Sequence, residues 1–320
     1  MSMLVDELPI QTAERQWRIL LERRPDLEPA IAVQRRLLRR ALTLGSKSHT
    51  FPAIPVTLTP DEVARKLSEG RPVLIGENIE TDGAALTPYL LGFCDDLESG
   101  SAGRPAGRLR NSLEHGDIDC GSLISASLTR RREAILTKAH HLGVAPDLLW
   151  LVAELAAGPI AHHFRRALLP SSRKATAAGR DGGTSAGMPN WQEGYCPACG
   201  SWPAFAERYA HALDGRLLRC SFCGCDWPFP TGHCVYCDAK GASVLTAGPG
   251  DDGQCLVDMC RDCGGYLKRL KVDGPIPFAL LPVEDLRTCD LDVSAAERGY
   301  GRPPLPEFAG AAEMPCPPVG

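Results

Sequence analysis

Apolar residues recur at helical spacing through the first half of the chain. Two such stripes open the sequence, and Pro25 separates them. Because apolar residues return about every three or four positions, the pattern predicts two amphipathic helices that each bury one face. The first stripe comprises Ile10, Ala13, Trp17, Leu20 and Leu21, and the second comprises Leu27, Ile31, Leu38 and Leu42.

Four arginines lie between the apolar positions of the second stripe, namely Arg35, Arg36, Arg39 and Arg40. Such a run is typical either of a nucleic-acid-binding face or of the solvated side of a helix. Acidic residues lie nearby, and this part of the chain is not basic as a whole. We therefore predict that the arginines form the solvated side of the helix.

More helices are predicted before residue 170. Thr59 suits an N-cap, Pro60 a first turn and Glu62 a capping box, so one helix should begin at Pro60 and end at Gly70. Residues 71–76 are predicted as a strand or buried loop and residues 99–106 as a turn region. The remaining helices should cover 87–97, 129–142 and 147–169, the last of them kinked at Gly158-Pro159. The first 170 residues are thus predicted to be all-α.

Short strands between turns are the pattern of the second half. Residues 171–190 are rich in Gly, Ser and Ala and show no periodicity, which predicts a flexible linker. Residues 201–208 and 216–220 then flank Asp214-Gly215, a hairpin signal. Residues 242–246 begin a second strand, turn and strand, with the turn at 249–253.

Four Cys-x-x-Cys pairs lie beside these predicted strands. Their spacing is C-x2-C-x20-C-x2-C, followed by C-x2-C-x22-C-x2-C. Two cysteines cannot complete a tetrahedron, so each half is expected to bind one metal ion, iron or zinc, with four thiolates. Small metal modules bury few side chains, so the metal should supply much of their folding free energy. The predicted ligands are Cys196, Cys199, Cys220 and Cys223 in the first site and Cys234, Cys237, Cys260 and Cys263 in the second.

Two further cysteines, Cys225 and Cys255, lie next to these pairs. They are candidate accessory thiols, either alternative ligands or redox-active groups, although four pairs already complete two sites and a bystander role is favoured. Cys94 and Cys120 have apolar neighbours in the sequence and are expected to be buried structural thiols.

Composition and charge limit the choice of function. The net charge is −4 and the pI is about 6.1, and acids outnumber bases between residues 190 and 275, so little attraction to nucleic acid is expected. No basic segment followed by an apolar one opens the chain, and no apolar run is long enough to span a membrane. Cys-x-x-Cys pairs of this kind are expected in a reducing cytoplasm.

Several motifs resemble those of the FdhE family, the formate dehydrogenase accessory proteins. They are GYCPACGSWP at 194–203, LRCSFC at 218–223, Asp226-Trp227, CRDCGGYLK at 260–268, FPAIP at 51–55, GRPVL at 70–74, and a tail pattern with Asp285-Leu286, Leu291-Asp292, Glu297 and Gly299-Tyr300. The chain departs from many relatives at Cys225 and around Cys255.

The resemblance implies a multidomain protein, with an all-α N-terminal domain followed by two tandem rubredoxin-like or zinc-ribbon modules of small β type. The expected divisions are 1–170 for the helical domain, 171–190 for the linker, 191–230 and 231–275 for the two modules, and 276–320 for a tail with a short helix. It also implies that the eight paired cysteines are the family's metal ligands.

The leading functional hypothesis is a non-enzymatic assembly factor. The resemblance implies a cytoplasmic protein that respiratory formate dehydrogenase needs, and that binds the molybdenum catalytic subunit before its export. Trp202 and Trp227 are candidate exposed anchors for this partner. A homodimer is left open, and neither nucleic-acid binding nor membrane insertion is expected.

Two alternatives remain, a rubredoxin-like protein that exchanges electrons with the immature enzyme, and, less favoured, a nucleic-acid-binding zinc ribbon. An enzyme is not expected, because four thiolates leave a metal ion no open coordination position.

Overall fold

The computed structural model describes residues 3–48, 51–100, 102–169, 191–209, 216–248 and 254–306, and for residues 3–8 it describes the backbone alone. The chain forms two compact units. Described residues of the first unit lie in 3–57 and 74–164, and those of the second lie in 58–73 and 165–306. The predicted linker, 171–190, lies outside the described residues.

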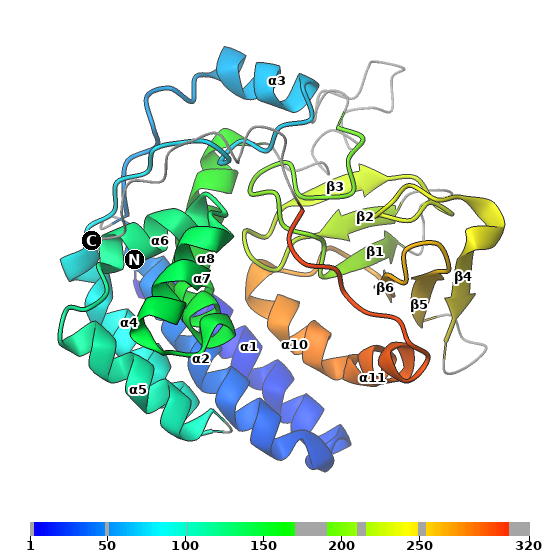
Figure 1. Cartoon of the computed structure of the whole chain (residues 1–320). Coiled ribbons are helices and arrows are strands. Elements are labelled where there is room, and N and C mark those ends of the chain that lie inside the picture. The colour runs from blue at the N-terminus through cyan, green and yellow to red at the C-terminus, as the bar shows by residue number, and fades with distance from the viewer. Residues whose placement is uncertain are drawn as a thin grey trace. The chain divides into compact units, whose positions relative to one another are not determined.

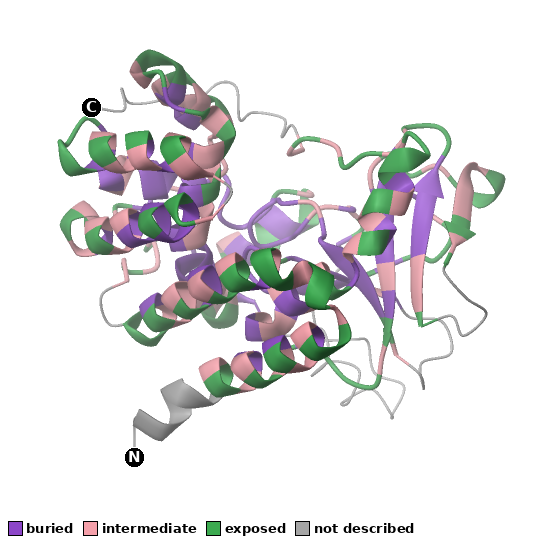
Figure 2. Cartoon of the chain, turned by 90° about the horizontal axis from the view of Figure 1, so that it is seen from below, coloured by how far each residue is buried: buried purple, intermediate pink, exposed green. Residues whose placement is uncertain are grey.

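The first unit is a bundle of α-helices, as the sequence predicts. Helix α1 packs against α2, α2 against α4, α4 against α5 and α6, and α6 against α7. Most of these helices bury one side and expose another, which Figure 2 shows as mixed colours along the ribbons. The bounds are α1 (Met3–Arg23), η1 (Pro25–Leu27), α2 (Glu28–Ser46), α4 (Gly83–Glu98), α5 (Gly103–Glu114), α6 (Cys120–Leu128), α7 (Arg132–Leu142) and α8 (Pro146–Leu168), whose residues from Arg165 on count with the second unit (Figure 1).

Local signals explain where several of these helices begin and end. Pro25 stands in the short 3-10 turn that separates α1 from α2. Gly143 adopts a left-handed φ of 63° directly after α7, a conformation that glycine reaches at little cost. Helix α8 is continuous through Pro159.

The arginine run of α2 is matched by carboxylates of the same unit. Arg35 and Arg39 pair with Glu14 of α1, and Arg40 lies 2.7 Å from Asp96 of α4. The guanidinium groups stay partly exposed, as predicted for the solvated side of a helix. Because acids already neutralise them, they offer phosphate groups little attraction.

The prediction of a turn at 99–106 was wrong in its second half, because α5 begins at Gly103. Pro105 stands in the first turn of this helix, where a missing N–H removes no helical hydrogen bond. Buried Ala106, Leu109 and Leu113 then give the helix its apolar face. Helix α6, which the sequence patterns missed, is short and is buried along most of its length.

The second unit is built on one six-stranded sheet, with the strand order β3-β2-β1-β6-β5-β4. Neighbouring strands are antiparallel except at the centre, where β1 and β6 run parallel and Phe205 pairs with Lys268. The strands are β1 (Phe205–Tyr209), β2 (Arg216–Arg219), β3 (Asp226–Phe229), β4 (Val244–Ala247), β5 (Cys255–Cys260) and β6 (Tyr266–Val272). The predicted turns at Asp214-Gly215 and at 249–253 lie outside the described residues.

The sheet joins the two predicted modules. Strands β1 to β3 belong to the first four-cysteine segment and β4 to β6 to the second, and the β1–β6 pair makes them one surface. The predicted fold class is confirmed, since a helical N-terminal region is followed by a small sheet region with two four-cysteine clusters. The domain boundaries at 170, 190, 230 and 275 stay predictions.

Helices complete the second unit. Helix α3 (Pro60–Ser68) begins as predicted, with the Thr59 hydroxyl accepting a hydrogen bond from the Glu62 N–H. Residues 73–76 form a turn rather than a strand, and residues 72–75 are buried. Leu281 of α10 (Leu281–Arg287) packs with Phe205 and Leu270, and Ala295 of α11 (Cys289–Glu297) packs with Met259 and Tyr266. Two short 3-10 turns, η3 (Gly241–Ser243) and η4 (Phe278–Leu280), precede β4 and α10. None of the helices within the described ranges has the length and apolar character that a membrane span requires.

Candidate metal centres

Four turns of one construction carry the eight paired cysteines. In each turn the N–H of the first cysteine donates to the carbonyl five residues later. The four bonds join Cys196 to Ser201 (2.8 Å), Cys220 to Cys225 (3.0 Å), Cys234 to Ala239 (2.8 Å) and Cys260 to Gly265 (2.8 Å). This repetition aims both thiols of every pair to the same side of its turn.

The residue after each second cysteine adopts a left-handed conformation. Gly200, Gly224 and Gly264 have φ values of 80°, 69° and 69°. Asp238 takes the equivalent place in the third turn with φ 57°. Aspartate tolerates this region better than most side chains, so the third turn forms without glycine.

The turns face one another in two pairs, as the spacing predicts. The first cluster joins Cys196, Cys199, Cys220 and Cys223, and the second joins Cys234, Cys237, Cys260 and Cys263. Within each cluster all four Sγ atoms lie within 4.8 Å of one another.

The sulfur spacing fits a bound metal ion. Cys196 and Cys223 Sγ lie 3.5 Å apart, and Cys199 and Cys220 Sγ lie 3.6 Å apart. In the second cluster the corresponding distances are 3.7 Å for both Cys234–Cys263 and Cys237–Cys260. A tetrahedron with metal–sulfur bonds of about 2.3 Å has edges of about 3.8 Å. Each cluster could therefore hold one metal ion.

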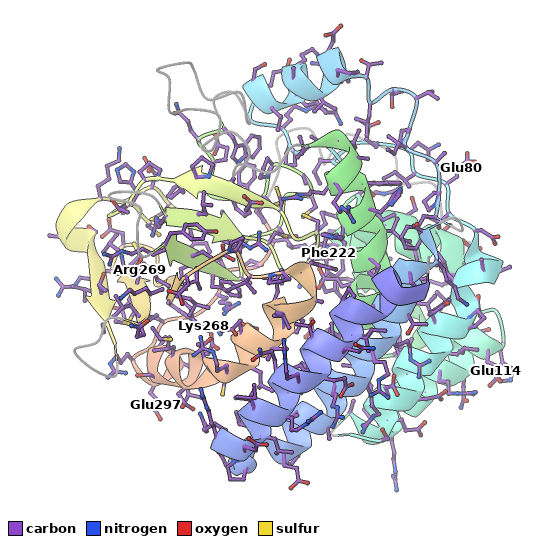
Figure 3. All side chains as sticks on the ribbon, turned by 180° about the vertical axis from the view of Figure 1, so that it is seen from behind. Glu80, Glu114, Phe222, Lys268, Arg269 and Glu297 are labelled. Atoms are coloured by element: carbon purple, nitrogen blue, oxygen red, sulfur yellow. The ribbon has the colours of Figure 1, made fainter. Side chains whose placement is uncertain are left out.

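The two clusters differ in their access to solvent. All four cysteines of the first cluster are fully buried. Phe222, which lies between Cys220 and Cys223 in the sequence and is labelled in Figure 3, is buried as well. In the second cluster Cys234 and Cys260 are buried, whereas Cys237 and Cys263 are exposed. The second cluster thus presents one side to solvent.

Burial opposes ionisation of these thiols. It is the largest influence on Cys196 and Cys223 and raises the pKa of both well above the ordinary 9.0. At the second cluster, partial desolvation raises the pKa of Cys263 to about 11, although the residue reaches the surface. Because a metal ion binds the thiolate, its binding must release protons.

The two candidate accessory thiols lie in different surroundings. Cys225 is fully buried beside the first cluster and interacts with Cys196, Cys223 and the Arg165 guanidinium. Cys255 is half-buried on β5, and its Sγ lies 3.7 Å from a guanidinium nitrogen of Arg287. Neither belongs to the four-sulfur clusters.

Trp227 is not exposed, which corrects one expectation. Its side chain is fully buried on β3, and its indole N–H donates to the Glu193 carbonyl. A buried indole cannot anchor a partner without unfolding its strand. Trp202 is half-buried between the Tyr195 and Tyr236 rings, and its N–H donates to the Pro304 carbonyl at 2.6 Å. Its part in partner binding stays a prediction.

A buried charge network supports the first cluster and was missed from the sequence. Arg165 lies 2.7 Å from Asp226, and Arg219 lies 3.0 Å from Glu207 and 3.5 Å from Asp226. Glu207, Arg219 and Asp226 are almost wholly buried. Two cations and two anions compensate one another directly behind the second turn, which fixes the strands that carry it.

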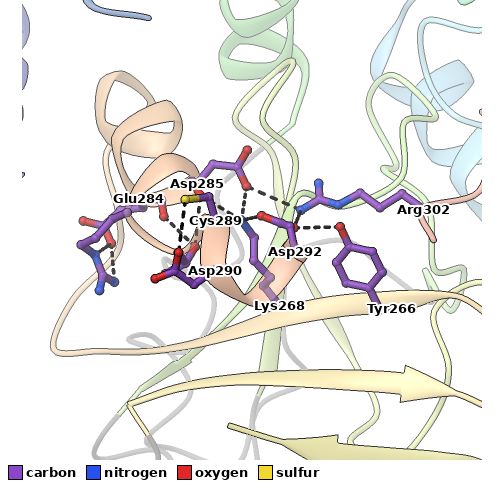
Figure 4. Close-up of polar contacts among 10 residues, drawn as sticks. Tyr266, Lys268, Glu284, Asp285, Cys289, Asp290, Asp292 and Arg302 are labelled. Atoms are coloured by element: carbon purple, nitrogen blue, oxygen red, sulfur yellow. Dashed lines mark hydrogen bonds and ion pairs between the residues drawn. The ribbon is translucent and has the colours of Figure 1, made fainter. Parts of the chain in front are cut away.

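A second network fastens the C-terminal helices to the sheet (Figure 4). Lys268 on β6 is fully buried, and its ammonium lies 2.6 Å from Asp285 and 2.7 Å from Asp292. Tyr266 donates a hydrogen bond to Asp292, and Arg302 lies 2.9 Å from the same carboxylate. Asp285 and Asp292 belong to the tail pattern that the sequence singled out, although nothing in the pattern indicated their partner on the sheet.

Part of the chain is similar in sequence to known FdhE homologs. No family model matches the chain. The chain is 34% identical over 109 residues to a protein FdhE homolog from Stutzerimonas stutzeri (strain A1501), a match that covers 33% of this chain and 35% of the relative. It is 31% identical over 115 residues to a protein FdhE homolog from Aquifex aeolicus (strain VF5), covering 34% and 40%. The sequence matches thus span well under half of these relatives.

The fold is similar over a longer range. The crystal structure of the FdhE protein from Pseudomonas aeruginosa superposes with a TM-score of 0.55 over 93% of both chains, at 21% identity. Together, the sequence matches and the fold confirm the resemblance that the motifs indicated.

Proposed function

We propose that this chain, an FdhE-family protein by its sequence matches and its fold, is a non-enzymatic accessory factor for formate dehydrogenase. In this proposal it acts in the cytoplasm and binds the molybdenum catalytic subunit before that subunit is exported. The two four-cysteine clusters would each hold an iron or zinc ion and would keep the second unit rigid.

The observation that carries the proposal is the pair of complete four-sulfur clusters on one sheet. The Sγ atoms of Cys196, Cys199, Cys220 and Cys223 lie within 4.8 Å of one another, as a four-thiolate site requires, and the second cluster repeats the arrangement. Four thiolates leave a metal ion no position for water or substrate. Such centres suit a rigid binding surface better than hydrolytic or transfer chemistry.

The charge distribution also speaks against a nucleic-acid partner. The arginine run of α2 is paired with Glu14 and Asp96, and the sheet carries buried, compensated ion pairs. A nucleic-acid surface would instead need a group of uncompensated cations.

Co-purification tests the proposal directly. The full chain, carrying an affinity tag, is expected to retain the catalytic subunit of formate dehydrogenase co-expressed with it. Cys220→Ser should lose one metal ion and most of this binding, because it opens the buried first cluster. Cys289→Ser, which alters a half-buried thiol outside both clusters, is the matched control. Full binding by a folded Cys220→Ser chain, or no binding by the unaltered chain, would contradict the proposal.

A redox role is the second candidate, and the exposure of Cys237 and Cys263 favours it. An iron ion at the second cluster would lie close to solvent, where electron exchange with a partner is easiest. The chain is purified without oxygen, and its metal content and visible spectrum are measured before and after exposure to air. About two irons with thiolate bands that change on oxidation would support this role, and zinc alone would exclude it.

A further inference from the structure

The two clusters have similar distances between their sulfur atoms, but they differ in how far they are buried from solvent. Residues 196–200 and 222–227, which surround the first cluster, are buried without a break. Around the second cluster, Cys237 and Cys263 are exposed together with their neighbours Asp238 and Asp262. A small molecule in solution can therefore reach two cysteine residues of the second cluster but none of the first.

Two hydrogen bonds hold residues 70–73 against the first cysteine turn and its neighbour Tyr195. The Val73 N–H donates to the Pro197 carbonyl at 2.9 Å, within the first cysteine turn. The Tyr195 hydroxyl donates to the Gly70 carbonyl at 2.9 Å. These bonds tie the segment after α3 onto the turn, so opening the first cluster requires local unfolding.

At the second cluster, each exposed cysteine has its sulfur at reacting distance from the sulfur of a buried cysteine. Cys263 Sγ lies 3.7 Å from Cys234 Sγ, and Cys237 Sγ lies 3.7 Å from Cys260 Sγ. An oxidised exposed thiol would thus have a second thiol beside it to form a disulfide. Oxidation is selective for accessible thiolates with such a neighbour.

We propose that the second cluster is a peroxide-sensitive site that releases its metal ion when its cysteines are oxidised, while the first cluster keeps its metal. This inference rests on the metal occupancy proposed above but not on the identity of the partner protein. Its substrate class is a small peroxide, and its product is a pair of disulfides.

The chemistry balances with the peroxide as the oxidant. The Cys263 thiolate attacks one peroxide oxygen, the O–O bond breaks, and a sulfenic acid forms as hydroxide leaves. The Cys234 thiolate then attacks that sulfur, so that an S–S bond forms and a second hydroxide leaves. Cys237 and Cys260 consume a second peroxide in the same way. Four thiolates thereby lose four electrons to two peroxides, and a redox-inactive ion such as zinc would leave with its charge unchanged.

Zinc makes the test unambiguous, because it takes no part in redox chemistry. The full chain, with Cys255, Cys289 and Cys316 replaced by serine, is loaded with zinc and its content is measured. Hydrogen peroxide is then added with a chromophoric zinc chelator, and disulfides are mapped by mass spectrometry of peptides.

Release in two phases is the expected result. One zinc per chain should leave at least about tenfold faster than the other, since thiol oxidation follows exposure. The early disulfides should join Cys263 with Cys234 and Cys237 with Cys260, while the cysteines of the first cluster stay reduced.

Two variants assign the phases. Cys263→Ser should abolish the fast phase, and Cys196→Ser should retain it. If a variant does not fold, the peptide map of the parent chain still decides the question. Equal release of both ions, or oxidation of the first cluster before the second, would overturn the inference. Failure to load two zinc ions would instead contradict the proposed sites themselves.

Discussion

The ammonium of Lys268 lies 2.7 Å from the carboxylate of Asp292, and the lysine side chain is fully buried beneath it. Lys268 comes from the central strand β6, whereas Asp292 comes from α11. Asp285 and Arg302 complete the same group. The contact therefore joins the C-terminal helices to the middle of the sheet that carries both cysteine clusters.

We predict that removing the Asp292 carboxylate costs more stability than removing the Lys268 ammonium. Asp292→Ala should destabilise the second unit by about 3 kcal/mol, because it weakens the compensation of a buried cation. Lys268→Met should cost only about 1 kcal/mol, because Asp285 and Asp292 are partly exposed and keep Arg302. Urea unfolding followed by tryptophan fluorescence measures both, with the exposed Glu297→Ala on α11 as control. Equal losses for the two variants would argue against this account.

The contact between Gly194 and Val235 gives a second prediction. A Cβ at Gly194 would overlap the Val235 carbonyl oxygen, which belongs to the third cysteine turn. Gly194→Ala should therefore push the first and third turns apart, cost about 3 kcal/mol and lower metal retention at both clusters. Gly274→Ala is the control, since nothing lies within 4 Å of its Cβ position. Metal content after dialysis and thermal unfolding are the measurements, and unchanged retention in Gly194→Ala would refute the prediction.

The cap of α6 gives a prediction about pH. Asp119 accepts a hydrogen bond from the Ser122 N–H at 2.6 Å, and its bonds to the Ser122 side chain and backbone hold the pKa of Asp119 below the ordinary 3.8. Because the folded value is the lower one, the stabilisation from the charge is present above pH 3.8 and is lost as the pH falls through the folded pKa. Asp119→Ala should lower the stability of the helical unit by about 1 kcal/mol at pH 7.

Asp119→Asn separates the hydrogen bond from the charge, because asparagine is also an N-cap acceptor but does not titrate. The difference in stability between the unaltered chain and Asp119→Asn should shrink as the pH falls from 5 to 3. Circular dichroism during urea unfolding at several pH values follows it. A difference that grows toward low pH would have the wrong sign for this account.

Removal of the metal ions should affect the two units differently. Each ion is expected to contribute on the order of 10 kcal/mol to the folding of its cysteine turns. The helices of the first unit bury their own apolar faces and contain no cluster ligand. We expect a strong chelator to make residues 191–306 sensitive to protease while α1, α2 and α4 to α7 stay protected. Simultaneous cleavage in both units would show that the helices also depend on the metal.

The cysteine clusters could be predicted from sequence because their signal is local. Two residues between cysteines define a turn, and the gaps of twenty and twenty-two residues allow one hairpin between paired turns. The helix starts were readable for the same reason, as Thr59 shows. The local sequence gave a wrong prediction at Gly103: small residues there suggested a turn, but a helix begins instead.

The remaining features depend on partners far away in the chain. Nothing near Phe205 indicates that it pairs with Lys268, and a buried lysine has no pattern of its own. Trp227 was named as a candidate exposed anchor, but its side chain is fully buried, and Pro228 is the exposed residue of its strand. Burial of a short strand is decided by the neighbours it acquires and not by its own alternation.

The parallel pairing of β1 with β6 also constrains the order of events on the ribosome. The first cysteine turns and strands β1 to β3 leave the exit tunnel early, and their cluster is complete once Cys223 has emerged. The β1 edge then stays unpaired until residue 272 follows. An unpaired strand edge is prone to join other chains. A nascent chain that pauses between these points would therefore expose an unpaired strand edge, and prompt translation of the second half covers it.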